Sequence, residues 1–246
     1  MTAIHIDIRN KTYPAIGRAG VHRAIANLQL SLASNEFICL VGPSGCGKTT
    51  LLNIIAGLDP DFSGEITLGH QLKNPKIGYV FQNPRLLPWR TVRENITLAL
   101  PEDHAPEAVD ALLDLMQLTK AQNVYPERLS LGMSRRVSII RAFAVDPDIL
   151  LMDEPFVSLD APTARQVRKL LVKLWKQRPH TILFVTHDLR EAIALADRLI
   201  FLSAPPMRTI SEIIVSVPRG QRNDETQVEA FRRKLLEDYP EIKALL

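Results

Sequence analysis

The segment from which we infer the fold reads Gly42-Pro43-Ser44-Gly45-Cys46-Gly47-Lys48-Thr49-Thr50. It fits the pattern G-x-x-x-x-G-K-[ST], in which a glycine-rich loop holds phosphate groups. Glycines let the backbone curl so that its N–H groups point at phosphate oxygens. In this pattern Lys48 brings a positive charge to the β- and γ-phosphates, and the Thr49 hydroxyl ligates Mg²⁺. We therefore predict that residues 42–50 bind the phosphates of a nucleotide.

The flanks of this segment have the pattern that a phosphate loop requires. Residues 37–41 form a short apolar run typical of a buried parallel strand. Residues 49–58 indicate a helix that ends near Gly57. A helix N-terminus adds a favourable site for phosphate. Strand, loop and helix in this order favour the phosphate loop over the alternative, an ordinary glycine-rich turn.

Bulk composition is that of a soluble globular protein. The chain has 246 residues, of which 46% are hydrophobic and 23% charged. A formal net charge of +3 is too small to indicate a nucleic-acid partner. No apolar stretch reaches the roughly 18–20 residues of a membrane span, and the N-terminus has no signal-peptide pattern. Cys39 falls in the predicted buried strand and Cys46 in the loop, so we expect no disulfide and a cytoplasmic location.

Apolar runs alternate with helical periodicity along most of the chain, which predicts an α/β fold with a mainly parallel sheet. The predicted strands are 37–41, 77–81, 148–153, 181–186 and 198–203, and the predicted helices are 49–57, 163–177 and 188–196. Residues 3–9 and 25–32 alternate apolar and polar positions, as half-exposed antiparallel strands do. Prolines punctuate residues 84–145, which we interpret as a helical insert. After Pro218 we expect a polar linker and a final helix capped by Asp224.

Polar side chains at predicted strand ends supply the rest of a nucleotide site. Asp153 ends an apolar strand, where such a residue holds Mg²⁺, usually through water. Glu154 is placed to activate water against the γ-phosphate. His187 and Gln82 follow two further strands, and parallel strands bring their carboxyl ends to one edge. We expect His187 to lie near Glu154 and the γ-phosphate, and the Gln82 amide to touch both Mg²⁺ and the attacking water.

A second motif gives the family resemblance. Residues 129–136 read Leu-Ser-Leu-Gly-Met-Ser-Arg-Arg and resemble the signature of ATP-binding cassette (ABC) proteins. The resemblance rests on six elements in the right order: the phosphate loop, Gln82, this signature, Asp153-Glu154, Ser158-Leu159-Asp160 and His187. Residues 80–89, 91–96 and 152–156 look similar to the nitrate, sulfonate and taurine importer ATPases.

The resemblance implies an α/β P-loop NTPase (RecA-like) core with an N-terminal antiparallel β subdomain and an inserted α-helical subdomain. On this resemblance the ATPase domain would span residues 1–218, and residues 219–246 would be a C-terminal helical tail. Within the domain, the core would comprise about 1–83 and 146–218, and the helical subdomain about 84–145. It also implies a head-to-tail homodimer with two ATP molecules at the seam. Ser130 and the Gly132 N–H would meet the partner's γ-phosphate, and Asp160 would align the partner's site.

Departures from the family pattern fall at the signature and at the adenine contact. Leu131 replaces a glycine and has a high cost at positive φ, while Met133 replaces a glutamine and so removes an amide. We expect a working but slower site. The family stacks an aromatic residue on adenine, and Tyr13 is either that residue or a surface tyrosine at a strand end.

The expected function is that of the ATPase subunit of an importer, peripheral on the inner face of the plasma membrane. A separate transmembrane permease would insert a helix near residues 85–90, with Gln82 at a hinge, and a solute-binding protein would deliver the cargo. The alternatives are an ATP-switched ABC module without a transport role and an exporter or lipid-transport ATPase. A basic helix is interpreted as a solvated face rather than a nucleic-acid site; it carries Arg165, Arg168, Lys169, Lys173, Lys176 and Arg178.

Overall fold

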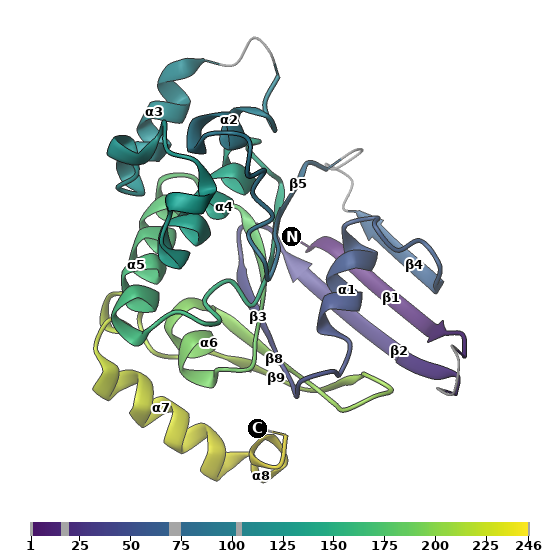
Figure 1. Ribbon diagram of the computed structural model, residues 1–246. Coiled ribbons are helices and arrows are strands. Elements are labelled where there is room, and N and C mark those ends of the chain that lie inside the picture. Colours follow the sequence, from purple (N-terminus) through teal and green to yellow (C-terminus); the bar gives the residue numbers. More distant parts are fainter. Residues whose placement is uncertain (1, 16–19, 69–74, 102–104, 246) are drawn as a thin grey trace. The chain divides into compact units, whose positions relative to one another are not determined.

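The computed structural model describes residues 2–15, 20–68, 75–101 and 105–245, which divide into two compact units. The first unit joins residues 1–74 to residues 181–246, and the second comprises residues 75–180 (Figure 1). The nucleotide-site residues predicted from the sequence are distributed over both units.

A three-stranded antiparallel sheet forms one part of the first unit. Its strands, in the order β2-β1-β4, are β1 (Thr2–Tyr13), β2 (His22–Ala33) and β4 (Ser63–Leu68). Ile4, Ile6 and Ile8 are completely buried on one face, where they pair with Leu32, Leu30 and Leu28. This alternation confirms the antiparallel strands predicted over 3–9 and 25–32. Both strands run longer than predicted because the β1–β2 ladder continues to the Tyr13–His22 pair.

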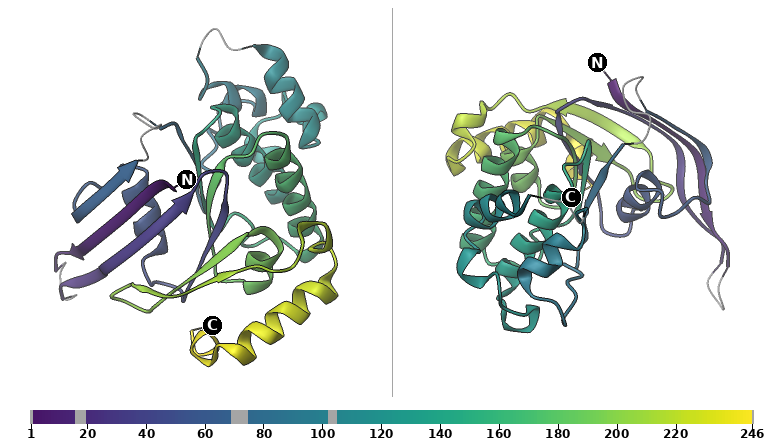
Figure 2. Two further views of the ribbon diagram at one scale, coloured as in Figure 1. Left: turned by 180° about the vertical axis from the view of Figure 1, so that it is seen from behind. Right: turned by 90° about the horizontal axis from the view of Figure 1, so that it is seen from above.

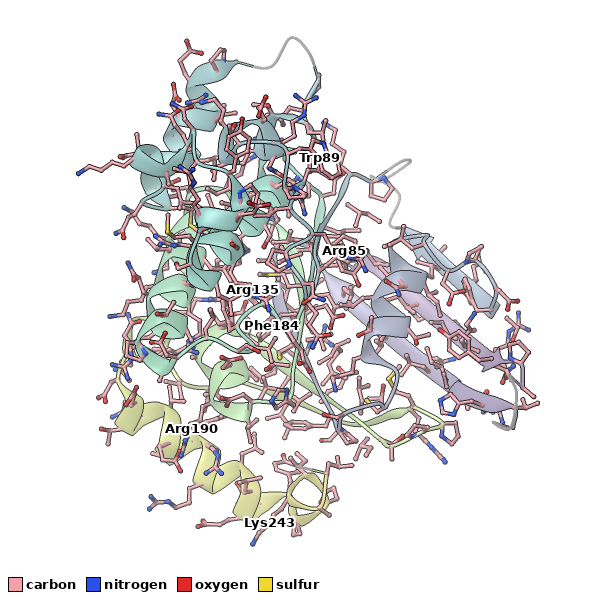
Figure 3. All side chains as sticks on the ribbon, in the orientation of Figure 1. Arg85, Trp89, Arg135, Phe184, Arg190 and Lys243 are labelled. Carbon is pink, nitrogen blue, oxygen red and sulfur yellow. The ribbon has the colours of Figure 1, made fainter. Side chains whose placement is uncertain are left out.

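The other part of the first unit is a set of parallel strands flanked by helices. The strands lie in the order β7-β3-β8-β9 and are β3 (Phe37–Val41), β7 (Thr181–Thr186), β8 (Arg198–Leu202) and β9 (Thr209–Ile214). Only β9 is antiparallel to its neighbour within this group. Every residue of β3 and β7 is buried, which confirms the strands predicted from apolar runs. Phe184 of β7, which is labelled in Figure 3, meets Phe37 edge to face.

The described part of the first unit also contains four α-helices, which are drawn in Figures 1 and 2. They are α1 (Lys48–Ile55), α6 (Leu189–Leu195), α7 (Glu225–Asp238) and α8 (Pro240–Lys243). α6 packs on β3 and β7, and α7 packs on α6. The prediction that Asp224 caps the final helix is confirmed, because its side chain accepts a hydrogen bond of 2.9 Å from the Thr226 N–H.

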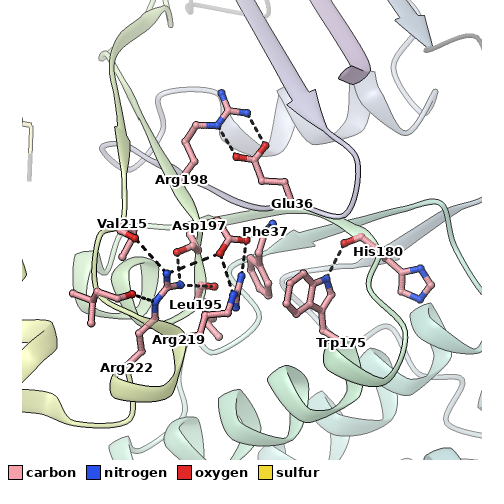
Figure 4. Close-up of polar contacts among 12 residues, drawn as sticks. Glu36, Phe37, Trp175, His180, Leu195, Asp197, Arg198, Val215, Arg219 and Arg222 are labelled. Atoms are coloured by element: carbon pink, nitrogen blue, oxygen red, sulfur yellow. Dashed lines mark hydrogen bonds and ion pairs between the residues drawn. The ribbon is translucent and has the colours of Figure 1, made fainter. Parts of the chain in front are cut away.

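The segment that we predicted to be a polar linker is instead fastened to the core (Figure 4). It forms the 3₁₀ turn η3 (Arg219–Gln221), followed by the buried Arg222. Arg222 donates to the Ala196 carbonyl at the end of α6 at 2.6 Å and to the Val217 carbonyl at 2.8 Å. Burial lowers the pKa of Arg222 to about 10. Arg219 donates to Asp197 at 2.6 Å, so polar residues here form structure rather than a loose connection.

The second unit combines a parallel strand pair with helices. Its strands are β5 (Ile77–Val80) and β6 (Ile149–Asp153), and its α-helices are α2 (Val92–Thr97), α3 (Pro106–Leu115), α4 (Leu131–Ala144) and α5 (Ala161–Gln177). Two 3₁₀ turns, η1 (Thr119–Ala121) and η2 (Pro126–Arg128), separate α3 from α4. α4 is the centre of this unit, because α2, α3, α5 and β5 all pack on it. Within the described residues of 84–145 every regular element is a helix or 3₁₀ turn, as we predicted for the insert.

The basic helix predicted at 163–177 is α5. Its apolar residues are buried on one side, among them Leu171 at 0% exposure, and its lysines lie on the other. Arg168 contacts the Phe156 ring, and the adjacent Arg178 pairs with Asp146. This arrangement supports a solvated helix face.

Across the described ranges no helix combines the length and apolar character needed to cross a membrane.

Candidate active site

The phosphate loop has the conformation that its glycines predict. Gly45 and Gly47 adopt φ of 75° and 108°, a region that favours glycine because other residues have a Cβ. The Cys46 N–H donates to the Pro43 carbonyl at 3.3 Å, which closes the turn. Gly47 is the N-cap of α1 and supplies no side-chain cap. The first N–H groups of an eight-residue helix therefore face the loop, as an anion site requires.

Lys48 is the first residue of α1, and its side chain crosses the phosphate loop. Its side chain is buried, with the residue 6% exposed, and Nζ donates to the Gly42 carbonyl at 2.8 Å and to the Pro43 carbonyl at 2.9 Å. The ammonium is thus held at the mouth of the loop. Cys46 is buried beside it, and burial raises the pKa of its thiol, which favours a small filler over a reactive cysteine.

His187 lies at the same edge of the sheet as the phosphate loop. β3 and β7 are parallel and pair Val41 with Thr186, so Gly42 and His187 follow neighbouring strand ends. The backbone around His187 is pinned, since Thr186 Oγ1 accepts from the Asp188 N–H at 3.1 Å. The Asp188 carboxylate then caps α6 by accepting from the Arg190 N–H at 2.8 Å. The parallel register of β3 and β7 therefore brings these two residues to one edge of the sheet.

Tyr13 is anchored at the end of β1 by its hydroxyl. The hydroxyl lies 3.1 Å from Thr50 Oγ1 of α1 and 3.2 Å from Asp59 Oδ2. Asp59 also pairs with the buried Lys11 at 2.7 Å. Burial alone lowers the Lys11 pKa, but the hydrogen bond and charge of Asp59 outweigh it and raise that pKa. The half-buried Tyr13 ring is therefore tied to the helix that leaves the phosphate loop.

Gln82 and the two acidic residues meet in the second unit. The parallel register of β5 and β6 pairs Val80 with Met152, so the next residues of each strand stay side by side. The Gln82 amide Nε2 donates to Glu154 Oε2 at 3.5 Å. Asp153 is 4% exposed, and Glu154 adopts a left-handed φ of 43°. A non-glycine residue held in the left-handed region costs the folded state about 1–3 kcal/mol. Residues held in such conformations cluster at functional sites.

The signature residues start α4, as the family resemblance implies. Ser130 is the N-cap, and its Oγ accepts from the Met133 N–H at 3.2 Å. A Cβ on Gly132 would lie 2.6 Å from Thr163 Cγ2 of α5, so packing requires a small residue. Leu131 is the first residue of α4 and is absent from the left-handed residues of the described chain. The steric cost that we expected at Leu131 therefore does not arise.

Asp160 has a local role that the sequence pattern did not reveal. It is the N-cap of α5, and its carboxylate accepts from the Thr163 N–H at 3.0 Å. Hydrogen bonds from Thr163 lower the Asp160 pKa. Thr163 also lies against Gly132 of the signature. Asp160, which is predicted at the dimer seam, and the signature therefore both contact Thr163.

Arg135 and Arg141 of α4 contact the segment that contains Gln82, and sequence reasoning missed both. Arg135 donates to the Gln82 carbonyl, and Arg141 donates to the Pro84 carbonyl at 2.8 Å. The only available signal was their place among the apolar residues of this helix, and the charge pattern alone does not separate such residues from solvated arginines.

Oxygen donors of the kind that Mg²⁺ takes occur in each of the two units. Among the described residues there is no group of three or more His, Cys, Asp or Glu side chains that would hold a metal by itself. Mg²⁺ commonly takes one or two protein oxygens and completes its shell with phosphate and water. The buried Asp153 carboxylate and Thr49, next to Lys48 at the start of α1, are donors of that kind.

Comparisons with known proteins agree with this geometry. The sequence profile of the family described as ABC transporter matches residues 25–157. The aliphatic sulfonates import ATP-binding protein SsuB of Bacillus subtilis (strain 168) is 38% identical over 250 residues, covering 99% of this chain and 96% of that protein. The nitrate import ATP-binding protein NrtD of Synechococcus elongatus is 40% identical, covering 92% and 85%.

A solved structure shows the same relationship. The ATP-binding cassette MJ0796, a dimer in a post-hydrolysis state bound to ADP and Pi, superimposes with a TM-score of 0.74. It is 30% identical in sequence, and the match covers 86% of this chain and 98% of that chain. This likeness extends the family match beyond residue 157. The chain therefore belongs to the ABC transporter family and is an ATPase subunit of that family.

Proposed function

We propose that this ATPase subunit powers solute uptake through a separate transmembrane permease. The observation that carries the proposal is the phosphate loop, whose glycines adopt left-handed φ and whose carbonyls hold the Lys48 ammonium. Two relatives are named as import ATP-binding proteins, one for aliphatic sulfonates and one for nitrate. Identities near 40% over most of both chains support import as the direction of transport.

Each site residue has a proposed part in hydrolysis. The loop N–H groups and Lys48 bind the β- and γ-phosphates, while Tyr13 supports adenine. Thr49, Asp153 and the Gln82 amide would hold Mg²⁺, which would supply charge neutralisation at the phosphates. Glu154 accepts the proton of the attacking water, and His187 donates to the γ-phosphate. The 3.5 Å contact from Gln82 to Glu154 supports their action on one water molecule.

Dimerisation completes the proposed site. Ser130 and the Gly132 N–H stand at the start of the 14-residue helix α4, a favourable position for a partner's γ-phosphate. Asp160 aligns the partner's site at the seam. The dimeric cassette MJ0796 supports this assembly. In a twofold dimer both ATP sites form or break together. ATP binding stabilises the closed dimer, and hydrolysis reopens it.

The proposed permease contact lies between Arg85 and Arg90. Trp89 is 68% exposed on this loop, and the Arg85 guanidinium lies 3.9 Å from the centre of the Phe81 ring (Figure 3). An exposed indole and an arginine stacked on an aromatic ring, both in this segment, suit an amphipathic helix of a permease. The subunit would then sit on the cytoplasmic face of the membrane, and a solute-binding protein would deliver cargo to the permease.

Purification from native membranes tests this function. We expect the tagged chain to co-purify with a membrane-spanning protein, and the complex to hydrolyse ATP. Recovery only in a soluble complex would instead support the alternative of an ATP-switched module without a transport role. Release of solute from preloaded vesicles, rather than uptake, would support an exporter.

Substitution of Met133 by Gln is expected to raise ATP turnover of the assembled transporter about two- to five-fold. Ser130 already caps α4, and a glutamine three residues later would complete a capping box. The added amide would also supply hydrogen-bonding groups where the partner's phosphate is proposed to bind. Steady-state phosphate release from the purified complex measures the effect. An unchanged or lower turnover would contradict this role of position 133.

Tyr13→Ala is expected to raise the KM for ATP about ten-fold, because base–aromatic stacking is worth about 1–3 kcal/mol. Tyr13→Phe keeps the ring but removes the hydroxyl contacts with Thr50 and Asp59. That variant should lower the melting temperature while leaving KM near the wild-type value. If Tyr13→Ala changes KM less than two-fold, the tyrosine is a structural anchor and adenine is bound elsewhere.

A further inference from the structure

Lys11 and Tyr13 stand two residues apart at the end of β1, and so on the same face of the strand. The Lys11 ammonium lies over the Tyr13 ring, 4.7 Å from its centre. At this distance the electron-rich face of an aromatic ring attracts a cation. Lys11 is 2% exposed, so the contact is shielded from water, unlike that of a mobile surface lysine. One face of the ring is thereby held, and the opposite face is left for a ligand.

Asp59 and Asp61, which follow α1, fix the position of the Lys11 ammonium. Its Nζ donates to Asp59 Oδ1 at 2.7 Å and to the Asp61 carbonyl at 2.6 Å. The Asp59 N–H donates to the Asn53 carbonyl of α1 at 3.2 Å. Since α1 begins at Lys48, the cation against the ring is tied to the helix that leaves the phosphate loop.

The Tyr13 hydroxyl adds contacts at the edge of the ring. It donates to Asp59 Oδ2 at 3.2 Å, and it can therefore accept a hydrogen bond from the Thr50 hydroxyl, 3.1 Å away. With its edge and one face held, the half-buried ring has little freedom to lose when a planar base stacks on it. Such preorganisation strengthens binding without any added contact.

Packing alone does not account for an ion pair at this position. The Lys11 side chain is 2% exposed and that of Asp59 is 20% exposed. Burial raises the pKa of Asp59, but the hydrogen bond and charge of Lys11 outweigh it and lower that pKa, so the pair is ionised at neutral pH. Removing two charges from water is costly, and apolar residues of similar volume would fill the same space more cheaply. The pair supplies what apolar residues lack, a fixed cation for the ring face.

We propose that Lys11 is a positioning residue, which holds one face of the Tyr13 ring so that the adenine base stacks on the other. Asp59 acts in the same role by fixing the Lys11 ammonium. Neither residue is assigned a phosphate contact, so their loss should weaken the binding only of ligands that carry a base. The inference rests on the proposed contact between Tyr13 and adenine.

Isothermal titration calorimetry on the full-length chain tests the proposal with two ligands, ATP and inorganic tripolyphosphate, each with Mg²⁺. Tripolyphosphate can occupy the phosphate loop but has no base to stack. We expect Lys11→Met and Asp59→Asn each to raise the dissociation constant of ATP about five- to ten-fold, while that of tripolyphosphate stays within two-fold of wild type. The double variant Lys11→Met/Asp59→Asn leaves neither charge unpaired. It should melt closer to wild type than either single variant, with ATP binding still weakened.

Three substitutions in the same unit are the matched controls. Asp61→Asn removes a carboxylate that is 88% exposed and 3.6 Å from Lys11, while the Asp61 carbonyl keeps its bond, so both affinities should stay within two-fold. Glu36→Gln breaks another ion pair, that with Arg198 at 2.9 Å. It should lower the melting temperature and leave the ratio of the two affinities unchanged. Tyr13→Phe keeps the ring against the cation, so its ATP affinity should stay near the wild-type value.

The ratio of the two affinities decides the outcome. Equal loss of ATP and tripolyphosphate binding in the double variant would show that the pair only stabilises the fold, and unchanged ATP binding there would likewise overturn the positioning role. Tyr13→Ala distinguishes this failure from that of the proposed adenine contact. If Tyr13→Ala lowers the affinity for ATP alone, the adenine contact stands without the positioning role. If it leaves both affinities unchanged, adenine binds elsewhere and both proposals fail.

Discussion

Glu154→Gln is expected to reduce ATP hydrolysis about 10²–10⁴-fold and to trap an ATP-bound dimer. The amide cannot accept the proton of the attacking water, but it keeps the size and shape of the carboxylate. Binding through the phosphate loop should be unchanged, since the loop glycines and Lys48 are left intact. Phosphate release measures the loss of turnover, and light scattering in the presence of ATP and Mg²⁺ measures the dimer.

Glu107→Gln provides the matched control for this experiment. Glu107 lies exposed in the first turn of α3, so the same change of charge there should leave turnover and assembly unaltered. Full turnover in Glu154→Gln would show that another group serves as the base. Loss of turnover without an ATP-dependent dimer would contradict the proposed closure of the dimer.

Lys48→Ala is expected to weaken ATP binding about 100-fold, which corresponds to about 2.8 kcal/mol. Two effects combine in this variant. The charge that binds the β- and γ-phosphates is lost, and the Gly42 and Pro43 carbonyls lose their shared donor. Lys48→Arg should restore little, because a planar fork does not replace a compact ammonium in this loop. Titration with a fluorescent ATP analogue measures the dissociation constants.

The contrast between the two variants separates binding from chemistry. Lys48→Ala should lose both the nucleotide and the ATP-dependent dimer, whereas Glu154→Gln should keep both. Lys169→Ala, on the exposed face of α5, controls for the removal of a lysine. An ATP affinity within three-fold of wild type in Lys48→Ala would show that the loop does not bind the phosphates through this residue.

Local pattern was sufficient to predict the elements that position the site. The apolar run at 37–41, the glycines at 45 and 47, and the cap at Asp224 all appear as expected. Each depends on residues within a few positions along the chain. Backbone conformation and hydrophobic periodicity act at that range, so one sequence is enough to infer them.

Predictions that depended on non-local contacts were less successful. The run after Pro218 indicated a polar linker, but Arg222 is buried and donates to the Ala196 carbonyl at the end of α6. Leu131 was expected to be strained, but it starts a regular helix. In both cases the sequence specifies a residue type, while the partner that gives it a role lies elsewhere in the chain.

The sequence by itself determined that this protein has a phosphate loop, a strand-end acidic pair and an ABC signature, because each is a short run with its own backbone preference. Tertiary structure decided how these runs are joined within each unit. The register of β3 with β7 sets Gly42 beside His187, and that of β5 with β6 sets Gln82 beside Glu154. Arg135 of the signature helix donates to the carbonyls of Gln82 and Val157. Strand register and a buried side chain that bridges distant carbonyls are properties of packing, which a linear pattern of residues does not contain.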